Sequence, residues 1–193
     1  MAPPAATVLP AEVAAAVRDS VLAVGVRRTT LTDVARRAKV SRMTLYRMVP
    51  DVEALILAVM TTDFAALLLD AEAKASRRRT ARARLVAMTV DVARRLPDEP
   101  LFRRVIDVDP DLLLPYLTER IGSTQRFAID HVRRAISDGH TDGSIRKGDP
   151  EVMATAVLVA VLPFVVSARL LDGVGRDRAL DELDAGLDGW LQP

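Results

Sequence analysis

The 193-residue sequence contains no cysteine and has few aromatic residues. Without cysteine, disulfide bonds, thiolate zinc sites and cysteine nucleophiles are excluded. Aromatic residues make up only 4% of the chain, and no segment alternates β-branched with polar residues, so nothing predicts a β-sheet. Half of the residues are hydrophobic, and many of these are Ala or Leu. We therefore predict an all-α fold of about nine helices.

The sequence also lacks a strong membrane or secretion signal. Its most apolar run, residues 152–166, is fifteen residues long and contains Pro163, whereas a membrane span needs about 20 apolar residues. The N-terminal segment MAPPAATVLPAE has no basic residue and no long apolar core, which is not typical of a signal peptide. We expect a cytoplasmic protein in which the apolar run is buried at a subunit interface.

Few residues are available for catalysis. The two histidines, His131 and His140, lie on either side of a predicted loop, and no Ser-His-carboxylate arrangement or glycine-rich phosphate loop accompanies them. We therefore expect no enzyme activity and no cofactor.

A metal site is not expected either. Asp107, Asp109 and Asp111 resemble the start of a calcium loop, but the sixth position is not Gly and the twelfth is not Glu. The two histidines with nearby aspartates are a weak alternative that we do not favour.

The net charge of +1 hides an uneven distribution. Between Arg18 and Arg47, eight basic residues stand against two acidic ones, so the rest of the chain has a net charge of −5. A basic N-terminal third on an acidic body is typical of a protein whose N-terminal part binds nucleic acid.

The segment from Thr29 to Leu55 predicts two short helices joined by a tight turn, followed by a third helix. Thr30 and Ser41 are suited to begin the two short helices, because their hydroxyls can accept hydrogen bonds from the first turn. The residues predicted to face inward share helical spacing and small or aliphatic side chains: Leu31, Val34, Ala35, Ala38, Val40 and Leu45. This arrangement is a helix-turn-helix.

The second of these helices then presents Arg42, Met43, Tyr46 and Arg47 outward. Arg42 can bond the O6 and N7 atoms of guanine, and Met43 and Tyr46 offer apolar contact to a thymine methyl group. An alternative for Tyr46 is that its ring packs against the helix that follows.

The remaining predicted contacts set the register of the protein on DNA without reading its sequence. We predict that Thr30, Thr44 and Arg47 contact phosphates.

The run T-x-x-D-V-A-x-x-A-x-V-S-x-x-T-L-Y, from Thr30 to Tyr46, resembles the DNA-binding domain of the TetR (tetracycline-repressor-like) family. The resemblance covers roughly residues 10–60. Three positions depart from the family: Lys39 replaces a usual Gly in the turn, Val49 a usual aromatic residue, and Val52 a usual phosphate-binding Lys or Arg. Arg47 is a candidate to replace that phosphate contact.

Helical periodicity and turn residues divide the remaining chain. We predict a DNA-binding domain over residues 10–55 and a ligand-binding and dimerisation domain over 56–193. Beyond the helix-turn-helix, the expected helices cover residues 51–75, 80–96, 101–106 and 112–137, then an apolar helix opened by Pro150, and finally 176–191.

The family resemblance implies how these parts work. It implies a homodimer formed by the last two helices, an operator of two inverted half-sites, and repression relieved when a small molecule binds in the body. The inferred lining is mostly apolar, so we expect a hydrophobic or amphipathic effector. The candidate lining residues are the larger side chains of the body: Phe64, Leu68, Met88, Phe102, Tyr116, Phe127 and Phe164.

A second hypothesis is a helical protein-interaction module without effector control, in which the helix-turn-helix is only structural. Salt dependence of DNA binding separates the two hypotheses, because phosphate contacts weaken steeply with salt.

Overall fold

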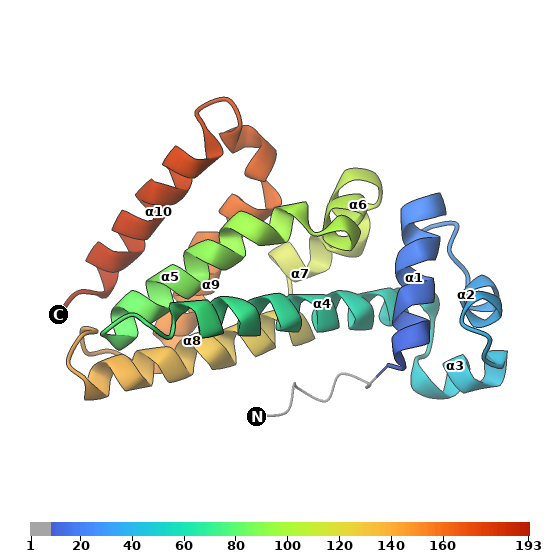
Figure 1. Cartoon of the computed structure of the whole chain (residues 1–193), viewed down its shortest axis with the longest axis horizontal. Helices are drawn as coiled ribbons and strands as arrows, with labels where there is room; N and C mark the ends of the chain where they lie inside the picture. Colours follow the sequence, from blue (N-terminus) through green and yellow to red (C-terminus); the bar gives the residue numbers. More distant parts are fainter. Residues whose placement is uncertain (1–8) are drawn as a thin grey trace. The chain divides into compact units, whose positions relative to one another are not determined.

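A computed structural model describes residues 9–193, and every regular element in that range is helical (Figure 1). The all-α fold class is therefore confirmed. The α-helices are α1 (Ala11–Val24), α2 (Leu31–Arg37), α3 (Arg42–Met48), α4 (Val52–Ala75), α5 (Ala81–Arg95), α6 (Pro100–Val108), α7 (Leu114–Thr118), α8 (Ser123–Thr141), α9 (Pro150–Val166) and α10 (Arg176–Leu191). Short 3-10 helices η1 (Leu96–Asp98), η2 (Pro110–Leu112) and η3 (Ala168–Leu171) lie between them.

The described chain forms two compact units that alternate along the sequence. The first unit contains residues 9–64 and 98–123, and the second contains residues 65–97 and 124–193. Residues 98–123 therefore pack with the helix-turn-helix and not with the remaining body residues. This packing division differs from the functional division at residue 55, which stays a prediction.

The core of the first unit forms around α1. Val13, Val17 and Val21 recur along one face of α1 and are fully buried, as the helical spacing predicts. Leu101 and Val105 of α6 belong to the same hydrophobic cluster. Because α6 supplies part of this core, the segment 98–123 stabilises the helix-turn-helix directly.

A buried carboxylate joins α6 to the loop between α1 and α2. Asp109 follows α6, is only 5% exposed, and accepts a 2.8 Å hydrogen bond from the Val26 amide. It also lies 3.5 Å from Arg27 Nε. Gly25 ends α1 at φ 83°, where a Cβ atom would approach the Asp109 carboxylate to 3.2 Å. Asp109 thus satisfies a buried amide and fixes the chain where it leaves α1.

Helix α4 contributes to the cores of both units. It has 24 residues and a mean hydropathy of 2.0 in its most apolar window, so by length and composition alone it is able to span a membrane. Leu55, Ile56 and Val59 are buried in the first unit, while Leu67 and Leu68 are buried in the second. Supplying apolar residues to two cores accounts for this composition.

The second unit is a helical assembly in which α10 packs on α5 and α9 (Figure 1). Leu180, Leu183, Leu187 and Leu191 form the buried face of α10, as their spacing predicts. An ion pair of 3.0 Å between Arg82 and Asp188 also joins α5 to α10.

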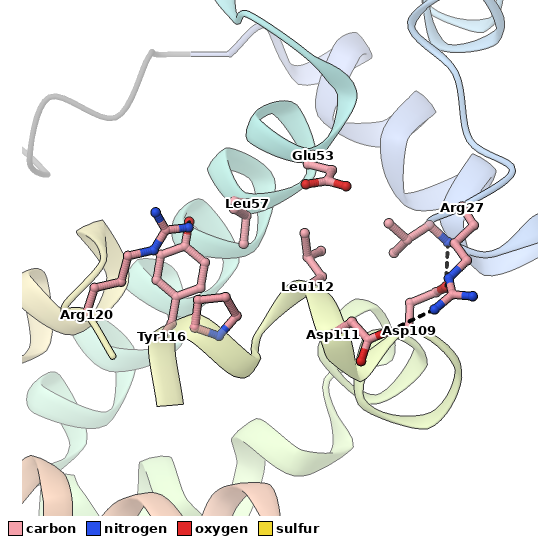
Figure 2. Close-up of a pocket in the computed structure, with 10 residues that line it drawn as sticks. Arg27, Glu53, Leu57, Asp109, Asp111, Leu112, Tyr116 and Arg120 are labelled. Carbon is pink, nitrogen blue, oxygen red and sulfur yellow. Dashed lines mark hydrogen bonds and ion pairs between the residues drawn. The ribbon is translucent and has the colours of Figure 1, made fainter. Parts of the chain in front are cut away.

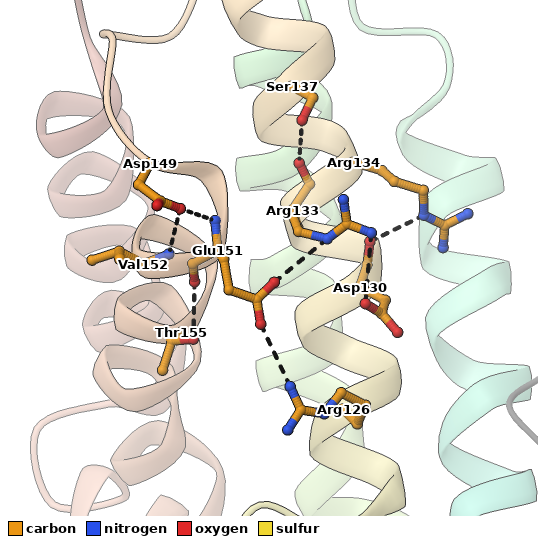
Figure 3. Close-up of polar contacts among 9 residues, drawn as sticks. All are labelled: Arg126, Asp130, Arg133, Arg134, Ser137, Asp149, Glu151, Val152 and Thr155. Atoms are coloured by element: carbon orange, nitrogen blue, oxygen red, sulfur yellow. Dashed lines mark hydrogen bonds and ion pairs between the residues drawn. The ribbon is translucent and has the colours of Figure 1, made fainter.

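Polar contacts tie the start of α9 to α8 (Figure 3). The Glu151 carboxylate lies 3.5 Å from guanidinium nitrogens of both Arg126 and Arg133. Asp149 caps α9 by accepting hydrogen bonds from the amides of Glu151 and Val152. These contacts hold α9 in place while part of its apolar surface stays exposed.

The single helix expected over residues 112–137 is wrong. The chain forms η2 and the five-residue α7, leaves helical geometry near residues 120–122, and begins α8 at Ser123. Pro115 lies in the first turn of α7, where a missing amide hydrogen is tolerated, so it marks the start of α7 and does not account for the break near residues 120–122. The helical periodicity alone did not reveal this break.

The turn between α2 and α3 carries an unusual backbone conformation. Lys39 has φ 55°, the left-handed region that glycine adopts most easily. Val40 donates its amide to the Ala35 carbonyl at 3.0 Å, which closes the turn. A left-handed conformation therefore occurs at the position where the family usually has Gly.

We predict that Lys39→Gly raises the free energy of unfolding by about 1 kcal/mol, because it removes the steric cost of a Cβ atom in this conformation. Urea denaturation of both proteins measures the change. As a control, Ala23→Gly in the exposed last turns of α1 should lower stability by up to about 1 kcal/mol. An unchanged or lower stability for Lys39→Gly would contradict the prediction.

Candidate DNA-binding surface

Two side-chain caps begin the helices of the helix-turn-helix. Thr30 Oγ1 accepts a 3.2 Å hydrogen bond from the Asp33 amide, and Ser41 Oγ accepts one of 3.1 Å from the Thr44 amide. Both caps were predicted from the sequence. They fix where α2 and α3 begin, and therefore which residues of α3 face outward.

The inward face of the motif is buried as expected. Leu31, Val34, Ala35 and Ala38 are each at most 7% exposed, and Leu45 is fully buried. Val40, in the turn, is half-buried.

The opposite face of α3 is open. Arg42, Met43, Tyr46 and Arg47 are all exposed, and their spacing places them on one side of the helix. Tyr46 is 50% exposed and Met43 is 61% exposed, so the Tyr46 ring is not buried in the core of the unit. A surface with two guanidiniums and two large apolar side chains has the chemistry that base edges and phosphates require.

The predicted phosphate-contacting hydroxyls are also exposed. Thr30 and Thr44 are exposed, and Thr44 Oγ1 is 2.8 Å from Ser41 Oγ. Each hydroxyl has capacity for a further hydrogen bond to a phosphate oxygen.

Half of the basic residues between Arg18 and Arg47 are engaged in ion pairs within the protein. Arg18 pairs with Asp63, Arg27 with Asp109 and Asp111, and both Arg36 and Arg37 with Asp33. The other four basic residues are exposed and form no ion pair with residues 9–193: Arg28, Lys39, Arg42 and Arg47. The charge available to DNA is therefore concentrated on α3 and the two connections that precede α2 and α3.

Asp33 remains negatively charged over the whole useful pH range. Hydrogen bonds from Arg37 and then Arg36, at 2.7 and 2.5 Å, lower the pKa of Asp33 to about 2. Ser20 also donates to this carboxylate at 3.2 Å. Asp33 consequently neutralises part of the positive charge of α2 and links α2 to α1.

The other two departures from the expected family pattern are also visible. Val49 is 5% exposed and fills a core position, while Val52 is half-buried in the first turn of α4 and packs against the same hydrophobic cluster. Neither side chain offers a polar group to DNA. Arg47 is exposed, which leaves it free for the phosphate contact that Val52 lacks.

The candidate effector-binding residues are divided between the two units. Phe64, Phe102 and Tyr116 belong to the first unit, whereas Leu68, Met88, Phe127 and Phe164 belong to the second. Leu68, Met88 and Phe127 are 3–4% exposed, and Phe164 is half-buried. Their role in effector binding stays a prediction.

Sequence reasoning missed two acidic residues near the helix-turn-helix. The sequence pattern gives Asp109 only as part of an incomplete calcium loop, yet Asp109 fixes the α1–α2 connection. Glu53 lies in the first turn of α4 and faces a cleft of the same unit. No local sequence pattern indicates either role, because both depend on contacts between distant segments.

Comparisons with known proteins place the chain in a family. No family model matches the chain. The chain is 34% identical over 168 residues to an uncharacterised HTH-type transcriptional regulator of Mycobacterium bovis, and the alignment covers 86% of each protein. A regulator of the same description from Mycobacterium tuberculosis strain H37Rv gives the same identity and coverage.

Solved structures share the fold. The TetR family repressor AlkX of Dietzia sp. superposes with a TM-score of 0.65 at 22% identity, covering 93% of this chain and 94% of AlkX. FadR of Bacillus subtilis, solved in complex with stearoyl-CoA, has a TM-score of 0.65 at 13% identity, covering 94% of this chain and 98% of FadR. With its capped helix-turn-helix and these relatives, the chain belongs to the HTH-type transcriptional regulators, and its all-α fold is that of TetR-family regulators.

Proposed function

We propose that this regulator is a ligand-responsive repressor that acts in the cytoplasm and binds an inverted-repeat operator as a homodimer. A hydrophobic or amphipathic small molecule releases it from DNA. The exposed face of α3 is the observation that carries the proposal, because its residues match the requirements of DNA contact and are not used in the core.

In this proposal α3 enters the major groove with its N-terminal end toward the bases. Arg42 is the first residue of α3 and reads a guanine, while Met43 and Tyr46 contact thymine methyl groups. Thr30, Thr44 and Arg47 hold phosphates. Two such heads related by a two-fold axis require two inverted half-sites.

We predict that Arg42→Ala weakens binding to the preferred operator by about 1–3 kcal/mol and relaxes selectivity at one base pair. Selection from random duplexes with wild-type protein identifies the operator, and fluorescence anisotropy then measures both affinities. Binding to random DNA should change much less.

Arg28→Ala is the matched control, because Arg28 is also an exposed, unpaired arginine but lies in the α1–α2 connection. Its loss should be similar on operator and random DNA, as expected of a phosphate contact. The base-reading role of Arg42 would be wrong if Arg42→Ala lost equal affinity on both.

The proposed dimer interface uses an exposed apolar face of α9. Val152, Val159, Ala160 and Pro163 are exposed at spacings that place them on one side of the helix, and Val152 and Val159 are 65% and 64% exposed. An apolar stripe of this kind favours contact with another protein surface. On α10, the exposed residues Ala185, Gly186 and Gly189 are small enough to let a partner helix approach closely.

Replacing Val159 by Asp should weaken dimerisation by on the order of 100-fold, because each subunit would bury an unpaired charge. Sedimentation equilibrium measures the dissociation constant. Leu69→Asp, at an exposed apolar residue of α4 in the same unit, should leave the dimer intact. A Val159→Asp protein that dimerises like wild type would exclude α9 from the interface.

The proposed effector site lies among the large side chains of the second unit, with Leu68, Met88 and Phe127 at its centre. Their apolar surfaces fit a hydrophobic or amphipathic molecule. Thr89 Oγ1, next to Met88, is buried and has no hydrogen-bond partner within residues 9–193, so it is a polar group that a ligand could satisfy. Bound stearoyl-CoA in FadR and triclosan in SmeT, proteins of the same fold, support this class of effector.

We expect a ligand of this class to raise the melting temperature and lower the affinity for operator DNA, because it binds the DNA-free conformation better. Differential scanning fluorimetry with fatty acids, acyl-CoA esters and aromatic biocides, followed by operator titration, tests both effects. Met88→Trp should reduce the thermal shift by filling the site. If no compound moves both quantities, effector control is not supported.

The protein-interaction alternative makes a different prediction about salt. A regulator whose heads contact several phosphates loses affinity steeply as salt increases. The interaction module is favoured if DNA binding is absent, or if it is weak and equal for all sequences.

A further inference from the structure

A cleft of about 170 Å³ lies in the first unit, close to the helix-turn-helix (Figure 2). Its walls come from three segments: the α1–α2 connection, the first turns of α4, and residues 109–120, which include η2 and α7. Every lining residue belongs to the first unit. The cleft is therefore separate from the effector site proposed in the second unit.

The cleft combines an apolar floor with charged sides. Leu57 and Leu112 lie near its centre, with the Tyr116 ring at one side (Figure 2), and Pro115 also lines the cleft. Three carboxylates and two guanidiniums surround this floor: Glu53, Asp109, Asp111, Arg27 and Arg120. The negative charges thus outnumber the positive ones.

Both guanidiniums already have partners. Arg27 Nη2 lies 2.9 Å from Asp111 Oδ2, and its Nε lies 3.5 Å from Asp109. The Arg120 guanidinium lies 4.6 Å from the centre of the Tyr116 ring and donates to the Tyr116 hydroxyl at 3.3 Å. Arg27 is therefore held by two carboxylates and Arg120 by the Tyr116 side chain.

Glu53 differs from the other charged groups of the cleft. Its carboxylate is exposed and forms no ion pair within residues 9–193, and it faces the space above Leu57 and Leu112 (Figure 2). An unpaired carboxylate over an apolar floor, with an aromatic ring at the side, is complementary to a cation that carries an apolar body.

We propose that this cleft binds a small organic cation, such as an amidine or a primary amine with a short apolar group. The cationic end pairs with Glu53, and the apolar part lies on Leu57 and Leu112. The volume limits the ligand to a molecule of about one ring, below the roughly 300 Å³ at which sites for drug-sized ligands begin.

The position of the cleft connects the ligand to DNA binding. Asp109 forms one wall and holds the amide of Val26, in the connection that leads to α2. Glu53 forms another wall, in the helix that follows α3. A bound cation therefore contacts the segments before and after the helix-turn-helix and changes its affinity for DNA.

The test is calorimetric titration of the full-length, DNA-free protein with benzamidine, and with neutral benzamide as the matched ligand. Benzamidine should bind saturably at one site and benzamide much more weakly. Glu53→Gln should weaken benzamidine binding about fivefold. This factor corresponds to roughly 1 kcal/mol, the upper end of the interaction free energy of a solvent-exposed charge pair.

Glu12→Gln is the control variant, because Glu12 is also an exposed glutamate in the first turn of a helix of the same unit. It should bind benzamidine like wild type. Tyr116→Leu provides a second cleft variant and should also weaken binding, and melting temperatures verify that both cleft variants are folded.

The proposal is overturned if benzamidine does not bind, if benzamide binds equally well, or if a folded Glu53→Gln protein binds benzamidine like wild type. This titration contains no DNA and measures binding at a site outside the second unit. Its outcome is therefore independent of the proposed operator and effector. A separate operator titration with and without benzamidine then measures the coupling to DNA.

Discussion

The seven-residue helix α3 is too short to be stable by itself, and the rest of the first unit serves to hold it. Leu45 is the one residue of α3 with its side chain fully buried, and Val49 follows as a second apolar anchor. Ser41 fixes the start of the helix and the left-handed Lys39 fixes its direction. With so few anchors, the outer face of α3 stays free for DNA, but its position depends on α2, which packs against it, and on α1, which packs on both α2 and α6.

This dependence explains why some features were predictable from the sequence and others were not. Caps and helical spacing are local, so the sequence alone predicts the caps Thr30 and Ser41 and the buried face of α10. Asp109 acts on Val26, 83 residues earlier in the chain, and no local pattern reveals such a pairing. The same limit applies to segment 98–123, which joins the first unit through tertiary contacts of Leu101 and Val105.

Counting charges in the sequence also overstated the positive charge available to DNA. The run from Arg18 to Arg47 has a net charge of +6, but Arg36 and Arg37 share Asp33, and Arg27 is held by two aspartates. These exposed pairs are individually weak and contribute little to stability. Because these pairs neutralise the other basic residues, the unpaired positive charge lies on four residues around the helix that is proposed to read DNA: Arg28, Lys39, Arg42 and Arg47.

The two proposed ligand sites differ in how far the protein must rearrange to accept a ligand. Leu68, Met88 and Phe127 are each only 3–4% exposed, so an effector must displace the side chains that cover them before it can bind. Opening about 300 Å³ of apolar space costs on the order of 7 kcal/mol, at roughly 24 cal/mol per Å³. Because the core must open, the liganded conformation of the second unit differs from the unliganded one, and a switch requires two such conformations. The cleft beside Glu53 is already open and needs no such change. A cation there acts by adding contacts to the segments that flank the helix-turn-helix, so it is suited to adjust affinity for DNA and not to switch it off.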